Sequence, residues 1–234
     1  MFTLDKIASA ARGAGRDPES VKLVVVTKAQ PLEVARAAIE AGVKLLGENY
    51  PEEGVTKIQS LAEHSAVEWH MIGHVQSRKA QIVAQNFNYL HSLDGLKLAN
   101  RLNRFCGEAR RSLPVLLEFN VGGEQSKSGW QAFDESRWPE LTDDIAAVLA
   151  LPNLQVRGLM AMPPLGYTAE FSRPFFQRVR HLQEFLFTRF SQGSFSELSI
   201  GTSLDFEVAV EEGATLVRVG TAIAGPRQYN KTEA

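Results

Sequence analysis

The fold class is decided by the stretch Val21-Lys22-Leu23-Val24-Val25-Val26-Thr27-Lys28-Ala29-Gln30-Pro31. Residues 23–26 form a short, β-branched apolar run, typical of a strand buried on both faces of a parallel sheet. Pro31 then opens an alanine-rich segment that ends at Gly42, and this combination of a starting proline and a final glycine predicts a helix. Lys28 is therefore expected at the carboxyl end of a strand in a βα unit.

The position of Lys28 allows two interpretations. Barrels and doubly wound sheets bind ligands at the carboxyl ends of their strands. Partial desolvation on an apolar rim lowers the pKa of an ammonium and frees the amine to attack an aldehyde. In the alternative interpretation, the lysine stem packs along the strand and the ammonium reaches solvent. The stretch taken alone favours this second interpretation.

The composition is that of a globular protein of 234 residues, with 44% hydrophobic residues and a net charge of -2. This is close to the roughly 250 residues of one barrel. No run of Lys and Arg is longer than a pair such as Arg110-Arg111, so we expect neither a nucleic-acid nor a membrane partner. Without a signal-like or membrane-spanning segment, a soluble, cytoplasmic protein is expected. Cys106, the only cysteine, is interpreted as structural.

Seven further segments predict strands, and helical patterns separate them. The strands are expected at residues 43–50, 67–72, 88–93, 114–121, 154–160, 197–200 and 215–219, and the main helices at 3–14, 51–62, 95–110, 135–150, 170–190 and 202–212. Eight strands alternating with helices predict a (β/α)8 TIM barrel. The expected organisation is one domain over residues 1–234, with the barrel at about 22–225 and a tail at 226–234. A doubly wound α/β sheet is the competing architecture.

The loops after the last two predicted strands indicate a phosphate site. Gly201-Thr202-Ser203 follows the seventh strand, and Asp205 resembles the partner of Thr202 in a capping box. Gly220-Thr221 follows the eighth strand. Amide groups and hydroxyls at a helix start bind phosphate, and many barrels place phosphate at these two loops. Either loop alone would be an ordinary cap or turn, but the two together favour a phosphate ligand.

Other catalytic motifs are weak or missing. His70 and His74 have the spacing of a helical zinc pair, but the predicted strand and Gly73 place them across a strand-to-loop boundary, so no metal is expected. The sequence contains no Gly-x-Ser-x-Gly elbow, P-loop or Gly-x-Gly-x-x-Gly motif. A phosphate site and an imine-forming lysine on one rim fit two ligands. These are pyridoxal 5'-phosphate (PLP) and a phosphorylated sugar handled by a Schiff-base aldolase.

Six segments resemble the pyridoxal phosphate homeostasis proteins, which are single-domain relatives of the alanine racemase amino-terminal barrel. They are LVVVTK at 23–28, GENY at 47–50, WHMIGHVQS at 69–77, GLM at 158–160, LSIGTSLD at 198–205 and VRVGTAI at 217–223. The matches occur in order and extend over nearly the whole chain. The resemblance implies a barrel of the fold type III PLP kind and a role in intracellular vitamin B6 homeostasis.

The resemblance also implies roles for individual residues. Lys28 would hold PLP as an internal aldimine, Ser203, Gly220 and Thr221 would bind its phosphate, Asn49 and Met160 would flank its ring, and Arg218 would face the pyridine nitrogen. An arginine keeps that nitrogen unprotonated, which makes the cofactor a poor electron sink. Such a site suits holding PLP, or weak racemisation, more than strong carbanion chemistry. No catalytic residue is assigned, and PLP-dependent apoenzymes are candidate partners of a monomer.

The sequence departs from the family pattern near the expected rim. Thr27 stands where serine is more usual, Ala29-Gln30 replaces a threonine-lysine pair, and Ala224 replaces a phenylalanine. Alanine racemase itself is disfavoured by length, because no room follows residue 225 for its second domain. Three hypotheses result: a non-enzymatic PLP carrier, a PLP-dependent racemase or related enzyme, and an aldolase without a bound cofactor.

Overall fold

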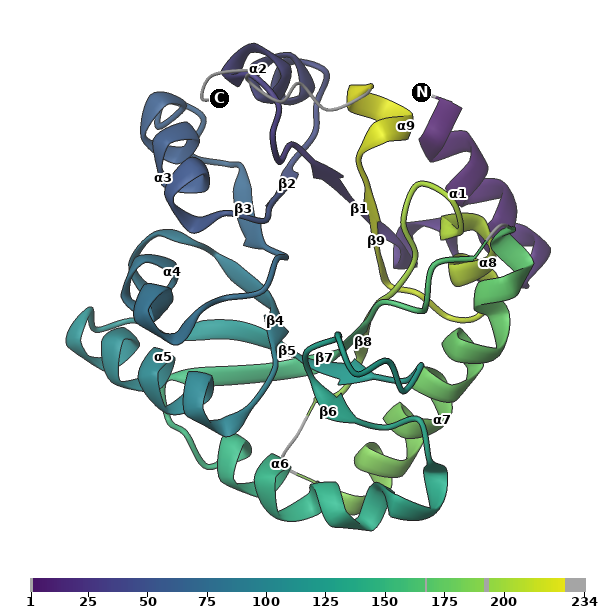
Figure 1. Ribbon diagram of the computed structural model, residues 1–234. Helices are drawn as coiled ribbons and strands as arrows, with labels where there is room; N and C mark the ends of the chain where they lie inside the picture. The colour runs from purple at the N-terminus through teal and green to yellow at the C-terminus, as the bar shows by residue number, and fades with distance from the viewer. Residues whose placement is uncertain (1, 167, 192–193, 226–234) are drawn as a thin grey trace, which may run out of the picture.

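The strands form a closed parallel barrel surrounded by helices (Figure 1). The computed structural model describes residues 2–166, 168–191 and 194–225. The barrel strands are β1 (Lys22–Val26), β2 (Leu45–Glu48), β3 (Glu68–Met71), β4 (Tyr89–Leu93), β5 (Leu113–Asn120), β7 (Leu154–Ala161), β8 (Glu197–Ser199) and β9 (Leu216–Val219). The sheet order is β4-β3-β2-β1-β9-β8-β7-β5, and pairing of β4 with β5 closes the ring. The predicted TIM barrel is confirmed, and the doubly wound sheet is wrong.

Helices follow the strands around the outside of the barrel (Figure 1). They are α1 (Phe2–Gly13), α2 (Leu32–Glu40), α3 (Pro51–Ser60), α4 (Ala80–Asn86), α5 (Leu96–Glu108), α6 (Thr142–Leu149), α7 (Arg173–Arg189), α8 (Phe206–Glu211) and α9 (Thr221–Ala224). Helix α5 shows why they form: Leu98, Leu102 and Cys106 recur at helical spacing and are all buried. The apolar core lies between these buried faces and the outer face of the barrel.

Several element boundaries differ from the prediction for local reasons. The segment expected as a helix over 135–150 begins as a 3-10 helix, Glu135–Leu141, because Pro139 lacks the amide hydrogen that an α-helical bond requires. A 3-10 turn, Ala169–Ser172, likewise precedes α7, which has a proline in its first turn. The loop after β5 contains a short strand, β6 (Trp130–Gln131), that pairs with β5. Neither β6 nor α9 was predicted.

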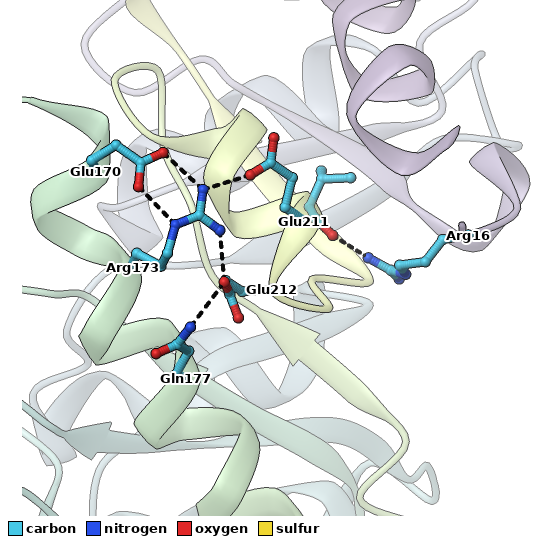
Figure 2. Close-up of polar contacts among 7 residues, drawn as sticks. Arg16, Glu170, Arg173, Gln177, Glu211 and Glu212 are labelled. Atoms are coloured by element: carbon cyan, nitrogen blue, oxygen red, sulfur yellow. Dashed lines mark hydrogen bonds and ion pairs between the residues drawn. The ribbon is translucent and has the colours of Figure 1, made fainter. Parts of the chain in front are cut away.

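Two arginines from opposite sides hold the carboxyl end of helix α8 (Figure 2). The Arg173 guanidinium on α7 contacts Glu211 and Glu212 at 2.6 Å each. Arg16, just after α1, donates to the Val210 carbonyl at 2.6 Å. Single exposed ion pairs contribute little stability, but one guanidinium shared by several carboxylates restricts the position of both helices. The two anchors therefore hold α8 against α7 and the amino-terminal segment.

The two ends of the barrel differ in what covers them. Leu4, Ile7 and Ala8 of α1 line a pocket together with residues from the amino ends of the strands, such as Lys22 and Glu68. Helix α1 therefore lies near the floor of the barrel. Most of the predicted ligand residues follow the carboxyl ends of strands, at the opposite side, whereas Met160 and Arg218 lie within β7 and β9.

Within the part of the chain that the structure describes, no helix has the length and apolar character needed to cross a membrane.

Candidate functional site

Lys28 lies on a tight turn at the carboxyl end of β1. Its side chain is half-buried. The next residue, Ala29, has φ 53°, a left-handed conformation that is uncommon for a residue other than glycine. The Ala29 amide donates a hydrogen bond to Glu53 Oε1 at 2.9 Å, and the Gln30 amide donates to the Thr27 carbonyl at 3.2 Å. These contacts hold the turn, so the backbone of Lys28 has a defined position on the rim.

A buried polar network supports this turn from behind. Lys57 Nζ donates to the Thr27 carbonyl at 2.6 Å, to Glu48 Oε1 at 2.8 Å and to Glu53 Oε1 at 2.7 Å. The Thr27 hydroxyl also donates to Glu48 Oε1, at 2.6 Å. Burial raises the pKa of Glu48, and the Lys57 ammonium opposes that change. A buried charge of this kind is tolerated only with a partner, so Glu48 and Lys57 depend on each other.

The sequence interpretation missed this network, although two signals were present. Glu48 ends an apolar strand where no surface charge is expected, and Glu53 and Lys57 have the i, i+4 spacing of a helical ion pair.

The two predicted phosphate loops meet in space. Ser203 Oγ accepts a hydrogen bond from the Gly220 amide at 3.1 Å. Gly201 has φ 88°, and a Cβ there would lie 2.5 Å from the Ala209 Cβ, so this turn requires glycine. The Thr202 amide donates to Asp205 Oδ1 at 2.7 Å, which is one half of the predicted capping box.

The other half of the predicted box differs. The Thr202 hydroxyl also donates to Asp205 Oδ1, at 3.1 Å, instead of accepting from the Asp205 amide. That amide bonds the Thr202 carbonyl in a turn, and α8 begins only at Phe206. The prediction of a helix starting at residue 202 was therefore too early.

The phosphate loops adjoin the strand that leads to Lys28. Strand β9 pairs with β1, and a Cβ on Gly220 would lie 3.3 Å from the Val26 Cβ. Thr221 follows as the exposed first residue of α9, where the amide has no partner within the helix. Ser203, Gly220 and Thr221 thus lie together beside the carboxyl end of β1.

Asn49 and Met160 lie on other strands of the same rim. Asn49 follows Gly47 by two residues, as Lys28 follows Val26, and Gly47 pairs with Val26. Asn49 and Lys28 thus follow the ends of two paired strands, and the side chain of Asn49 is half-buried. Met160 is buried in the barrel interior, where β7 pairs with β8 on one side and β5 on the other.

Arg218 is buried inside the barrel, and neighbouring residues hold its Nη1 and Nη2 atoms. Its Nη1 donates to the Ser199 carbonyl at 2.6 Å and also to Ser199 Oγ, while Nη2 donates to the Ala161 carbonyl at 3.2 Å. Burial lowers the pKa of Arg218 to about 10, so the guanidinium remains charged at neutral pH. A fixed positive charge therefore lies in the interior, next to the strand that carries Met160.

Glu118 is a titratable group at this end that the sequence interpretation did not single out. It pairs with Met160 across β5 and β7, and its buried Oε2 has no hydrogen-bond partner among the described residues. Burial raises the pKa of Glu118 to about 7, with a further contribution from Asp94. Its signal in the sequence was a lone glutamate inside an otherwise apolar strand.

The two histidines considered for a metal lie apart, as the predicted boundary requires. His70 is buried in β3, and the exposed His74 contacts Asp94 through Nδ1 at 3.0 Å. In the described ranges, no group of three or more His, Cys, Asp or Glu residues could hold a metal ion.

Comparison with known proteins identifies the family. The sequence model of the family described as alanine racemase, N-terminal domain, matches residues 4–228. The pyridoxal phosphate homeostasis protein of Vibrio alginolyticus is 42% identical over 219 residues, which cover 92% of this chain and 91% of the relative. PipY of Synechococcus elongatus has a similar structure without PLP, with TM-score 0.84 and 34% identity, covering 95% of this chain and 99% of PipY. A second PipY structure, with PLP bound, gives a TM-score of 0.81 at 34% identity and covers 94% and 100% of the two chains. On this evidence the chain belongs to the pyridoxal phosphate homeostasis proteins, within the alanine racemase N-terminal domain family.

Proposed function

We propose that this protein binds PLP at the carboxyl end of the barrel, holds it covalently through Lys28, and acts in intracellular PLP homeostasis. The observation that carries the proposal is the meeting of two loops beside one strand end. Ser203 and Gly220 are joined by a hydrogen bond, and Gly220 packs against the strand that leads to Lys28. The PLP-bound structure of PipY and the names of the relatives support the same ligand.

The side chains fit the chemical groups of PLP. The aldehyde of PLP forms a Schiff base with a lysine amine. Amides and hydroxyls suit its phosphate, so Ser203, Gly220 and Thr221 are assigned to that group. Asn49 and Met160 are assigned to the two faces of the ring, by their places on the rim.

Arg218 is assigned to the pyridine nitrogen. Its guanidinium is charged and cannot give up a proton at neutral pH, so it keeps that nitrogen unprotonated. The bound ring then accepts electrons poorly. This property favours storage and delivery of PLP over catalysis. We therefore propose PLP-dependent apoenzymes as recipients, and a monomer in the cytoplasm as the working form.

An enzyme acting through the same lysine is the alternative function. Glu118 favours it, because a carboxyl group whose pKa lies near 7 can both accept and donate a proton at neutral pH. Two-sided proton transfer in a racemase needs a second positioned group on the opposite face. We assign no residue to that role.

The proposal is tested by spectroscopy of the purified protein. With PLP, it should show an absorbance band near ~420 nm, typical of a Schiff base with a lysine. Lys28→Ala should remove this band, while Lys22→Ala, at the amino end of the same strand, should retain it. Borohydride reduction and peptide mapping should then place the pyridoxyl label on Lys28. A label on another lysine, or a persistent band in Lys28→Ala, would contradict the assignment.

A further inference from the structure

A row of hydrogen-bonded side chains crosses the barrel interior and ends on Arg218. Ser199 Oγ, which accepts from Arg218, lies 2.8 Å from His91 Nδ1. His91 Nε2 lies 2.8 Å from His70 Nδ1. All four side chains are buried, and they come from β9, β8, β4 and β3. The row therefore connects one wall of the barrel with the other.

The chemistry of its two ends fixes the direction of these hydrogen bonds. Arg218 can only donate hydrogen bonds, so Ser199 Oγ accepts from it and donates its own proton to another acceptor. Among the contacts of the described residues, His91 Nδ1 is the acceptor within reach of that proton. His91 is then protonated on Nε2 and donates to His70 Nδ1, which leaves His70 with its proton on Nε2.

The other end of the row agrees with this direction. His70 Nε2 lies 3.6 Å from Glu68 Oε2, too far for a hydrogen bond but close enough for the carboxylate to favour an N–H there. The His70 ring lowers the pKa of Glu68, so this carboxylate is ionised at neutral pH. Burial holds the pKa of His91 well below its ordinary value, with help from His70 and Arg218, so His91 is neutral as the row requires.

His70 also reaches the pocket at the floor of the barrel. This pocket has a volume of about 770 Å³, and His70 and Tyr89 line it. Tyr89 stacks on His70 with ring centroids 5.0 Å apart, and its hydroxyl donates to Glu197 at 2.9 Å. The His70 ring is therefore held in place beside the pocket, and its buried Nε2 atom has no hydrogen-bond partner in the described part of the chain.

We propose that His91 and His70 are positioning residues that hold Arg218 against the PLP ring through Ser199. The inference rests on the proposed function, because the role of Arg218 at the pyridine nitrogen is part of that function. A serine hydroxyl alone can rotate and accept in several directions. When His91 accepts the serine proton, the orientation of the hydroxyl is set, one of its lone pairs faces Arg218 Nη1, and the guanidinium is held in place.

The tautomers of the histidines provide a direct test that does not need the cofactor. In protein labelled with ¹⁵N, two-bond nitrogen–proton correlation spectra distinguish an imidazole protonated on Nε2 from one protonated on Nδ1. We expect both His91 and His70 to carry the proton on Nε2 in the protein without PLP. A His91 protonated on Nδ1, or on both nitrogens at neutral pH, would overturn the proposed row.

The affinity for PLP provides the second test, measured by equilibrium dialysis. His91→Leu keeps the size of the side chain but removes the acceptor, and should weaken PLP binding about tenfold, or about 1.4 kcal/mol. His91→Asn retains an acceptor near the position of Nδ1 and should bind more tightly than His91→Leu. His181→Leu, at an exposed position on α7, is the matched control and should bind like wild type. A folded His91→Leu protein with wild-type affinity would refute the proposal.

Chemical rescue tests His70 separately. His70→Ala should weaken binding, and added imidazole should restore it, because the vacated space adjoins the floor pocket. Wild type and His91→Leu should not respond to imidazole. If imidazole did not restore PLP binding to a folded His70→Ala protein, His70 would have no positioning role. If wild type itself bound no PLP, the proposed function would fail, and the tautomers would still decide whether the row exists.

Discussion

Glu118 should make the stability of this protein fall as the pH rises, and replacement by glutamine should remove that dependence. Its pKa in the folded protein is about 7, against 4.5 for an ordinary glutamate. The folded state therefore binds this proton more tightly than the unfolded state does. The stabilisation from Glu118 is fully present below about pH 4.5 and is lost as the pH rises to about 7.

The size of the effect follows from the two pKa values. One pKa unit corresponds to about 1.4 kcal/mol, so the full difference amounts to about 3 kcal/mol of unfolding free energy. Between pH 5 and pH 8, about 2 to 3 kcal/mol of this should be lost. Glu118→Gln resembles the protonated acid at every pH. Relative to wild type, the variant should therefore gain about 2 to 3 kcal/mol of stability on going from pH 5 to pH 8.

Urea denaturation at the two pH values, without added PLP, measures this gain. Glu40→Gln, at an exposed position on α2, is the matched control and should differ from wild type by less than about 0.5 kcal/mol at either pH. Subtracting the unfolding free energy of wild type from that of the variant at each pH cancels the contributions of all other titrating groups. A stability difference for Glu118→Gln that is the same at both pH values would show that the buried carboxylate ionises normally, and the argument would fail.

Three further predictions concern the ligand site and its support. Ser203→Ala and Thr221→Ala should each weaken PLP retention by about 1 to 3 kcal/mol in equilibrium dialysis, and an unaffected double variant would mean that the phosphate binds elsewhere. Lys57→Met should lower the unfolding free energy by about 3 to 5 kcal/mol, because it leaves the buried Glu48 carboxylate without its cationic partner. The control Lys79→Met removes an exposed ion pair and should lower the unfolding free energy by less than about 1 kcal/mol. The PLP-loaded protein in deuterated water should exchange the α hydrogen of L-amino acids far more slowly than ~1 s⁻¹, and faster exchange would favour the enzyme alternative.

The barrel was predictable because its signals are local. A parallel strand buried on both faces reads as a short β-branched run, as in residues 23–26, and α5 shows its buried face at helical spacing. The two predicted phosphate loops were recognisable for a similar reason, since glycine and hydroxyl residues follow directly after two strands. Their meeting was expected from barrel topology, and the Ser203 to Gly220 hydrogen bond agrees with that expectation.

The polar interior was not predictable in the same way. The contact between His91 and Ser199 joins residues 108 positions apart, and that between His70 and His91 joins residues 21 apart. Which side chain of a strand faces the lumen depends on register, and a shift of one residue reverses it. Nothing in the local sequence of their strands singles out His91 and Ser199. Only the closed barrel places His91 against Ser199, and Ser199 against Arg218. Glu48 and Lys57 carried local signals, but their contacts with Thr27 depend on how neighbouring elements pack.

The two polar clusters bear on the proposed retention of PLP with little catalysis. Burying Lys57 with Glu48, and Arg218 with its serine and histidine neighbours, removes charged groups from water at a considerable energetic cost. Each cluster supports one side of the proposed ligand: Lys57 bonds the backbone next to Lys28, and Ser199 bonds the guanidinium of Arg218. Groups that are fixed before the ligand arrives lose little entropy on binding, which increases affinity. Because the group proposed for the pyridine nitrogen is a cation, the same preorganisation would oppose protonation of the ring, so the proposed retention of PLP and the proposed weak catalysis would have one structural cause.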